Sequence, residues 1–214
     1  MARHRSAQDD TYQRILEIAG ARFMTYGFSR TTMDELASQL GMSKKTLYRY
    51  FGTKHEMVQA VVDAHLDHVR TQLLVAFEND ELPMVDRLTR ILHTVSRQLA
   101  RLGEPFLSDL ARYAPDIWED VERFREEQVF SRLEGLLAEG IAEGIVKPDV
   151  QPAVVVRIIS TIARGLVTPS VLTELELRPE SVVETLASMM YGGILTERGR
   201  ERMIETEDDD GDPR

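Results

Sequence analysis

Residues 31–51 read TTMDELASQLGMSKKTLYRYF, and this stretch predicts two short helices joined by a tight turn. Thr32, followed three residues later by Glu35, forms a capping box, which marks the first turn of a helix. Gly41 suits the left-handed backbone conformation in which many helices end. Ser43 is a preferred N-cap residue, so we expect a second helix to begin immediately after it.

The apolar residues of this stretch predict how its two helices pack. Leu36 and Leu40 give the first helix an inner face, and the small Ala37 lets the second helix cross closely. Leu47, together with the ring of Tyr50, anchors the second helix to the core. A second helix held in this way projects its N-terminal residues outward. In helix-turn-helix proteins that end enters the major groove of DNA.

Positive charge gathers in the same part of the chain. Lys44 and Lys45 occupy the first turn of the second helix, where the helix dipole disfavours cations until phosphates arrive. Residues 1–55 hold nine Lys or Arg and five Asp or Glu, a net charge of +4. The remaining residues hold 17 and 31, a net of −14, within a total of −10. A polyanion responds to the nearest patch, so we expect the basic segment to meet nucleic acid.

Apolar residues recur at helical spacing along the whole chain, and strand signals are scarce. The expected fold class is all-α, with a three-helix N-terminal helix-turn-helix domain joined by a long helix to a larger helical domain. The predicted helices cover residues 10–26, 32–40, 44–50, 54–77, 84–102, 106–113, 115–143, 151–173 and 179–203.

The composition excludes several classes of protein. The chain has no cysteine, which excludes disulfides and thiolate catalysis. Its start, MARHRSAQDD, is polar and basic and does not resemble a secretory signal. The most apolar run, AVVVRIISTIARGLV, is interrupted by Arg157 and Arg164 and is too short to span a bilayer. We therefore expect a soluble cytoplasmic protein with no membrane partner.

The stretch GFSRTTMDELASQLGMSKKTLYRYFGTKHEMVQAVV resembles the N-terminal domain of the tetracycline-repressor (TetR) family of transcriptional regulators. The resemblance covers residues 10–62 and rests on G-F-x-x-T-T, the L-G-x-S turn, T-L-Y-x-Y-F and the following T-K at the spacing of the family. It implies a ligand-responsive repressor: a homodimer that binds a palindromic double-stranded DNA operator and leaves it when a small-molecule effector occupies the larger domain. The implied domains are 1–53 for DNA binding, 54–204 for effector binding and dimerisation, and a disordered acidic tail at 205–214.

The resemblance also assigns DNA-contacting roles to individual residues. Tyr48 and Tyr50 match aromatic positions that contact phosphates and bases, although both rings could instead be core residues. Lys54 matches a phosphate-clamping lysine, and Lys44 and Lys45 occupy positions that set sequence preference. The predicted DNA-contacting residues are Thr32, Ser43, Lys44, Lys45, Thr46, Tyr48, Arg49, Tyr50 and Lys54.

Aromatic side chains of the larger domain suit an effector cavity, although any helical core contains such residues. Together with the surplus of carboxylates, they favour a largely apolar effector that carries, as one option, a cationic group. The long helix 54–77 is the expected lever between the effector and the DNA-binding head. The predicted pocket residues are His65, Phe77, Phe106, Tyr113, Trp118 and Phe124.

Dimerisation is expected through the last two helices, whose small residues permit close approach about a two-fold axis. Alternatively, one of the two apolar stripes belongs to the core of the domain itself. The predicted interface residues are Ile158, Ile162, Gly165, Val183, Leu186 and Met190.

Two other functions are compatible with parts of the sequence. His65-x-x-His68 has a spacing typical of metal ligands on a helix, so an enzyme or metal-binding protein that uses this pair and the aromatics is the alternative. A simpler interpretation of His65 is a buried core histidine. An adaptor that binds a protein partner through the acidic tail is a third hypothesis. No phosphate-binding loop, nucleophile elbow or paired-histidine metalloprotease motif appears, so we expect neither an enzyme nor a cofactor or metal site.

Overall fold

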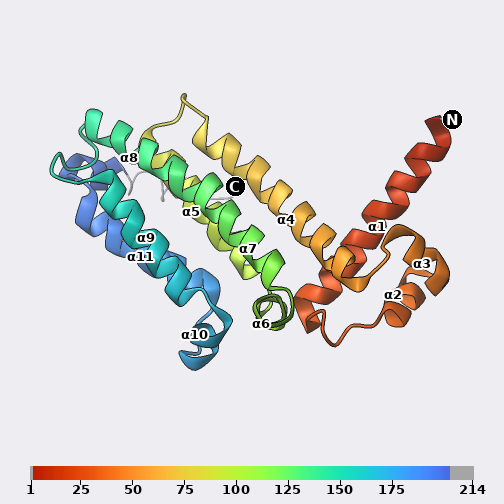
Figure 1. Cartoon of the computed structure of the whole chain (residues 1–214). Helices are drawn as coiled ribbons and strands as arrows, with labels where there is room; N and C mark the ends of the chain where they lie inside the picture. The colour runs from red at the N-terminus through yellow and green to blue at the C-terminus, as the bar shows by residue number, and fades with distance from the viewer. Residues whose placement is uncertain (1, 203–214) are drawn as a thin grey trace, which may run out of the picture. The chain divides into compact units, whose positions relative to one another are not determined.

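A computed structural model describes residues 2–202, with the side chains of residues 9–202 except 169 and 173 (Figure 1). In this range the regular structure is helical, apart from an isolated antiparallel β-bridge between Val146 and Leu195. The expected all-α fold is confirmed. The helices are α1 (Ala2–Tyr26), α2 (Met33–Leu40), α3 (Lys44–Tyr50), α4 (Lys54–Phe77), α5 (Met84–Ala100), α6 (Glu104–Tyr113), α7 (Pro115–Arg125), the π-helical turn η1 (Glu126–Phe130), α8 (Ser131–Ala142), α9 (Pro152–Leu166), α10 (Pro169–Glu174) and α11 (Pro179–Ile194).

Helices α3 and α4 begin and end where the sequence predicted, whereas both predicted C-terminal helices are interrupted. The helix expected over 151–173 breaks after Leu166, because Pro169 disfavours a helical conformation in the residue before it. The helix expected over 179–203 is interrupted after Ile194, where Leu195 joins the β-bridge. Lys147 N–H donates to Ile194 O at 2.9 Å beside this bridge.

The chain forms two compact units. The N-terminal unit comprises the residues up to 68 together with 101–121, and the C-terminal unit comprises 69–100 and the residues from 122 onward. The first unit thus extends past the boundary expected at residue 53. It does so because Phe106, Leu110 and Ile117, from α6 and α7, are buried in the same core as α1 to α4. The predicted acidic tail lies outside the described residues.

The C-terminal unit is built mainly from α5, α8, α9 and α11. Helix α11 packs on α5, and α8 packs on α9. Arg87 is buried in α5, where its Nη1 donates to Glu139 Oε2 of α8 at 2.7 Å and its Nη2 donates to Phe77 O at the end of α4. Among residues 2–202, no helix is long and apolar enough to cross a membrane.

Candidate nucleic-acid interface

The capping box predicted at the start of α2 is present. Thr32 Oγ1 accepts a hydrogen bond from Glu35 N at 3.2 Å, and Glu35 Oε2 accepts one from Thr32 N at 2.9 Å. The backbone N–H and the hydroxyl of Thr32 both donate to the carboxylate of Glu35, and these two hydrogen bonds, assisted by the nearby guanidinium of Arg22, lower the pKa of Glu35. The reciprocal pair fixes the residue at which α2 begins.

The turn after α2 sets the direction of α3. Gly41 adopts a left-handed conformation with φ of 67°, and Met42 N donates to Ala37 O at 3.0 Å. Ser43 Oγ then accepts a hydrogen bond from Thr46 N at 3.1 Å and caps α3. Leu47 is completely buried and anchors this helix to the core of the N-terminal unit.

The anchoring of α3 leaves a polar face exposed. Lys45, Tyr48 and Arg49 are exposed, and their spacing of three and four residues puts them on one side of the helix. Tyr48 is an exposed aromatic residue, with 42% of its surface accessible. Tyr50 is half-buried and packs against the core, which agrees with the alternative interpretation of that ring.

The first-turn lysines of α3 differ in their surroundings. Lys44 Nζ lies 2.7 Å from Asp34 Oδ2 of α2, and this hydrogen bond raises the pKa of Lys44. The carboxylate compensates for the unfavourable position of this cation in the helix dipole. Within the described part of the chain, no hydrogen bond or ion pair holds Lys45, which is exposed beside it.

Lys54, predicted to clamp a phosphate, has partners within the protein. Its Nζ donates to Phe28 O at 2.8 Å and to Thr31 O at 3.0 Å, and Ser29 O lies at 3.5 Å. The first residue of α4 therefore holds the loop between α1 and α2. Sequence reasoning missed this role, because spacing along the chain does not reveal which loop carbonyls an ammonium will meet.

A second residue that holds the same loop was also missed. Asp109 of α6 is buried, and its Oδ2 accepts a hydrogen bond from Ser29 N at 2.6 Å. Gly27, at φ 78°, has no room for a side chain, since an added Cβ would lie 2.5 Å from Asp109 Oδ2. Gly27 is the only sequence signal of this contact, because Asp109 lies 80 positions from Ser29.

The six side chains predicted for the effector pocket are divided between the two units. His65, Phe106, Tyr113 and Trp118 belong to the N-terminal unit, and Phe77 and Phe124 belong to the C-terminal unit. Phe106 is buried in the core, whereas Tyr113 is exposed. Arg132 lies over the ring of Phe77, and Arg70 lies over the ring of Phe124.

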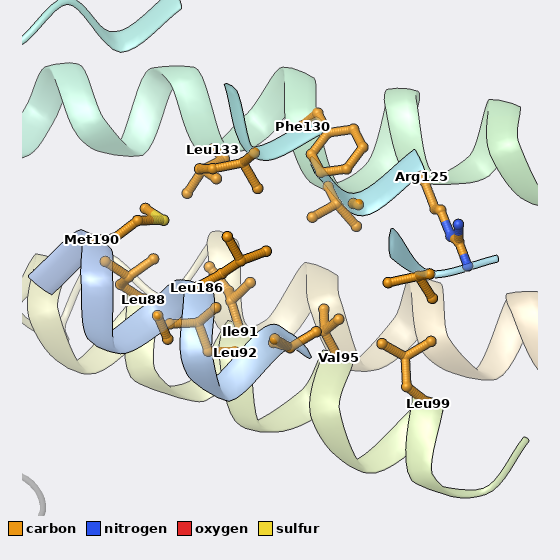
Figure 2. A pocket seen from close by; sticks show the side chains of 16 residues that line it. Leu88, Ile91, Leu92, Val95, Leu99, Arg125, Phe130, Leu133, Leu186 and Met190 are labelled. Atoms are coloured by element: carbon orange, nitrogen blue, oxygen red, sulfur yellow. The ribbon is translucent and has the colours of Figure 1, made fainter. Parts of the chain in front are cut away.

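A different set of residues lines a cavity of about 110 Å³ inside the C-terminal unit (Figure 2). The lining is mostly aliphatic, with Phe130 as its aromatic member and Arg125 as its charged member. None of the six predicted pocket residues belongs to it. Aliphatic residues at helical spacing look the same in a sequence whether they fill a core or surround a cavity, so the sequence held no signal for this site.

The predicted dimer residues fall into two groups. On α9, Ile158 and Gly165 are exposed, and Ile162 is half-buried. On α11, Val183, Leu186 and Met190 line the cavity instead. These three α11 side chains are half-buried and line a cavity of their own unit, which is compatible with the alternative interpretation; their role in a dimer stays a prediction.

The histidine pair on α4 does not form a cluster with acidic residues. His65 is partly buried, and burial, with the positive charges of His68 and Arg101 nearby, lowers its pKa. Among the side chains that the structure describes, no group of three or more His, Cys, Asp or Glu could hold a metal ion.

Comparisons with known proteins agree with the geometry of α2 and α3. Residues 15–61 match the model of the bacterial regulatory proteins, tetR family. The HTH-type transcriptional regulator YvaF of Bacillus subtilis is 30% identical over 116 residues, which span 54% of this chain and 60% of YvaF.

Solved structures share the fold over most of the chain. A TetR transcriptional regulator from Chloroflexus aurantiacus has a TM-score of 0.65 at 23% identity and covers 88% of this chain and 98% of its own. AibR, in complex with isovaleryl coenzyme A and operator DNA, has a TM-score of 0.58 at 19% identity, with coverages of 85% and 98%. The sequence relatives YvaF of Bacillus subtilis and NfxB of Pseudomonas aeruginosa are both HTH-type transcriptional regulators. The chain is thus similar to transcriptional regulators of the TetR family, and the match to the family model covers residues 15–61.

Proposed function

We propose that the protein is a repressor that binds a palindromic operator in the cytoplasm as a homodimer and releases it when a small molecule occupies the C-terminal unit. The exposed face of α3 carries this proposal. Lys45, Tyr48 and Arg49 project from a helix that Ser43 caps and Leu47 anchors. A short helix that is fixed at its turn and cationic on its outer face suits the major groove.

The two first-turn lysines of α3 are proposed to contact DNA in different ways. Lys45 is available for a base edge or a phosphate in the free protein. Lys44 has to exchange Asp34 for a phosphate, and both charges of that pair are exposed, so the exchange costs little. Thr32, Ser43 and Thr46, at the starts of α2 and α3, add hydroxyls for backbone contacts that position the protein without reading sequence.

Dimerisation is proposed through α9, with α11 beside it. Val154 and Ile158 are large apolar residues of α9 that are more than half exposed. An added Cβ at Gly165 would meet nothing within 4 Å, so a partner helix has room to approach there. On α11 the exposed apolar side chain is Met189, which is 69% accessible, rather than Met190. A two-fold axis at this surface would bury the same patch on both subunits.

The effector is proposed to bind in the cavity lined by Arg125 and Phe130. AibR shows that a protein of this fold can be found with a small molecule and operator DNA together. One helix, α4, supplies residues to both compact units and is the proposed link between effector and DNA. The coupling must be reciprocal, so operator DNA must weaken effector binding by the factor by which the effector weakens DNA binding.

An electrophoretic shift with the DNA upstream of the protein's own gene tests the proposal. We expect a complex at low salt that competitor DNA of unrelated sequence does not remove. A double variant, Lys45→Ala with Tyr48→Ala, should abolish the shift and keep the helical circular-dichroism spectrum of the wild type. A complex that survives this double change would place the DNA-binding surface elsewhere.

A further inference from the structure

The cavity in the C-terminal unit is elongated and has one polar end. Its lining includes α5 residues from Leu88 to Leu99, a separation of eleven residues that corresponds to about 16 Å along a helix. Figure 2 shows Arg125 near Leu99 at one end, whereas Leu88 and Met190 lie toward the other. The cavity is thus an elongated apolar space with Arg125, its one charged lining residue, at one end.

Arg125 keeps its positive charge in this setting, because arginine side chains remain protonated in proteins. Only 15% of its side-chain surface is accessible, and its Nη1 lies 2.6 Å from Glu122 Oε1. Burial lowers the pKa of Arg125, and the carboxylate of Glu122 opposes that effect. This end of the cavity therefore holds a poorly hydrated cation that is paired with Glu122.

Glu122 has a second cation within reach. Its Oε2 lies 3.5 Å from Arg164 Nε of α9 and is buried without a hydrogen bond. Arg164 also contacts Glu126 through its Nη2, at 2.5 Å. If another anion took the place of Glu122 on Arg125, Glu122 could turn fully to Arg164, and no charge would be left unpaired.

The backbone beside Arg125 departs from regular α-helical geometry. The π-helical turn η1 follows this residue directly, and Ser131 N donates to Glu126 O five residues earlier. Arg125, Val129, Phe130 and Leu133 all line the cavity from this segment. Single π-turns inside α-helices are frequent at functional sites.

We propose that the effector is an amphiphile with an unbranched apolar chain and a carboxylate head, whose head pairs with Arg125 and whose chain runs along α5 toward Met190. This inference rests on the proposed function, since it names the class of ligand that occupies the same cavity. It reverses the expectation of a cationic effector, because a cationic head would face a guanidinium group at the polar end and aliphatic side chains elsewhere.

Titration calorimetry on the full chain tests this assignment with three probes of equal chain length: octanoate, octanol and octyltrimethylammonium. We expect octanoate to bind roughly tenfold or more tightly than octanol, since it adds a hydrogen-bonded ion pair, and the ammonium probe to bind most weakly. Arg125→Met should remove the advantage of octanoate and leave octanol unchanged. Glu122→Gln should strengthen octanoate binding several-fold by removing the competing carboxylate.

Two control variants separate a loss of carboxylate binding at Arg125 from a loss of folding and from the removal of any arginine. Arg125→Lys retains the charge and should retain part of the preference for octanoate, which guards against a general loss of folding in Arg125→Met. Arg97→Met removes an exposed arginine of α5 that does not line the cavity, and it should change nothing. Thermal unfolding of each variant confirms that it is folded.

Three outcomes would overturn the inference: equal binding of octanoate and octanol by the wild type, octanoate affinity that survives Arg125→Met, or binding of none of the probes. A shift assay with operator DNA separates this failure from that of the proposed function. If DNA binds normally but no carboxylate does, only the ligand class is wrong. If octanoate binds as expected but operator affinity does not change, the ligand class stands and the proposed switch fails.

Discussion

The ammonium of Lys54 lies 2.8 Å from the carbonyl oxygen of Phe28, so the first residue of α4 holds the loop that leads into α2. Asp109 of α6 contacts the same loop, because its Oδ2 accepts a hydrogen bond from Ser29 N. The helix-turn-helix pair is thus attached to α4 and α6 by two charged side chains. A movement of α4 or α6 within the N-terminal unit would therefore shift this loop first and would shift α3 only through the loop.

Lys54→Ala should destabilise the protein, because it removes hydrogen bonds to the carbonyls of Phe28 and Thr31. The expected loss is about 1–3 kcal/mol in the free energy of unfolding, measured by urea denaturation. The phosphate contact predicted from the sequence implies a second, separate effect. Lys54→Ala should reduce the slope of the logarithm of DNA affinity against the logarithm of salt concentration by about one. Unchanged stability with a reduced salt slope would mean that Lys54 acts only on DNA.

Asp109→Ala should cost about 1–3 kcal/mol of unfolding free energy, since it leaves the Ser29 N–H without its acceptor in a tightly packed loop. Asp116→Ala is the matched control, because Asp116 is an exposed carboxylate of the same unit whose partner is His55. We expect a much smaller loss for the control in the same denaturation experiment. Equal losses would show that the buried contact has no special role.

The partial burial of His65 predicts a pH dependence of stability. Its pKa is lowered in the folded state by burial and by the charges of His68 and Arg101, so the unfolded chain takes up the proton first, near pH 6.5. Stability should therefore fall as the pH drops below about 6.5 and should level off once the folded state is protonated as well. His65→Gln should flatten this part of the curve of melting temperature against pH. A curve that His65→Gln leaves unaltered would assign the slope to other groups.

A charge on α9 should separate the proposed dimer. Ile158→Glu places a carboxylate on the exposed apolar face, and we expect monomers by light scattering with unchanged circular dichroism. Met190→Glu should behave differently, because Met190 lines the cavity, and a charge there should lower the melting temperature instead. Dimers that persist in the Ile158 variant would exclude the α9 surface.

Local signals predicted the helix-turn-helix pair well, and long-range contacts explain what they missed. The bounds of α3, the capping box of Thr32 and Glu35, and the burial of Leu47 follow from residues within a few positions of one another. The placement of α6 in the N-terminal unit depends on packing against helices far away in the sequence. Periodicity shows which residues of a helix turn inward but not which partner they meet, so it does not separate a cavity lining from a dimer face on α11.

The most direct test of the central claim is the affinity of the full chain for its own upstream DNA as a function of salt concentration, measured by fluorescence anisotropy. Wild type should bind at low salt, with the logarithm of affinity falling linearly with the logarithm of salt concentration. Lys45→Ala should reduce that slope by about one, while Arg97→Ala, which removes an exposed cation of the C-terminal unit, should leave it unchanged. No binding at low salt, or an equal effect of the two changes, would contradict the assignment of α3 as the helix that meets DNA.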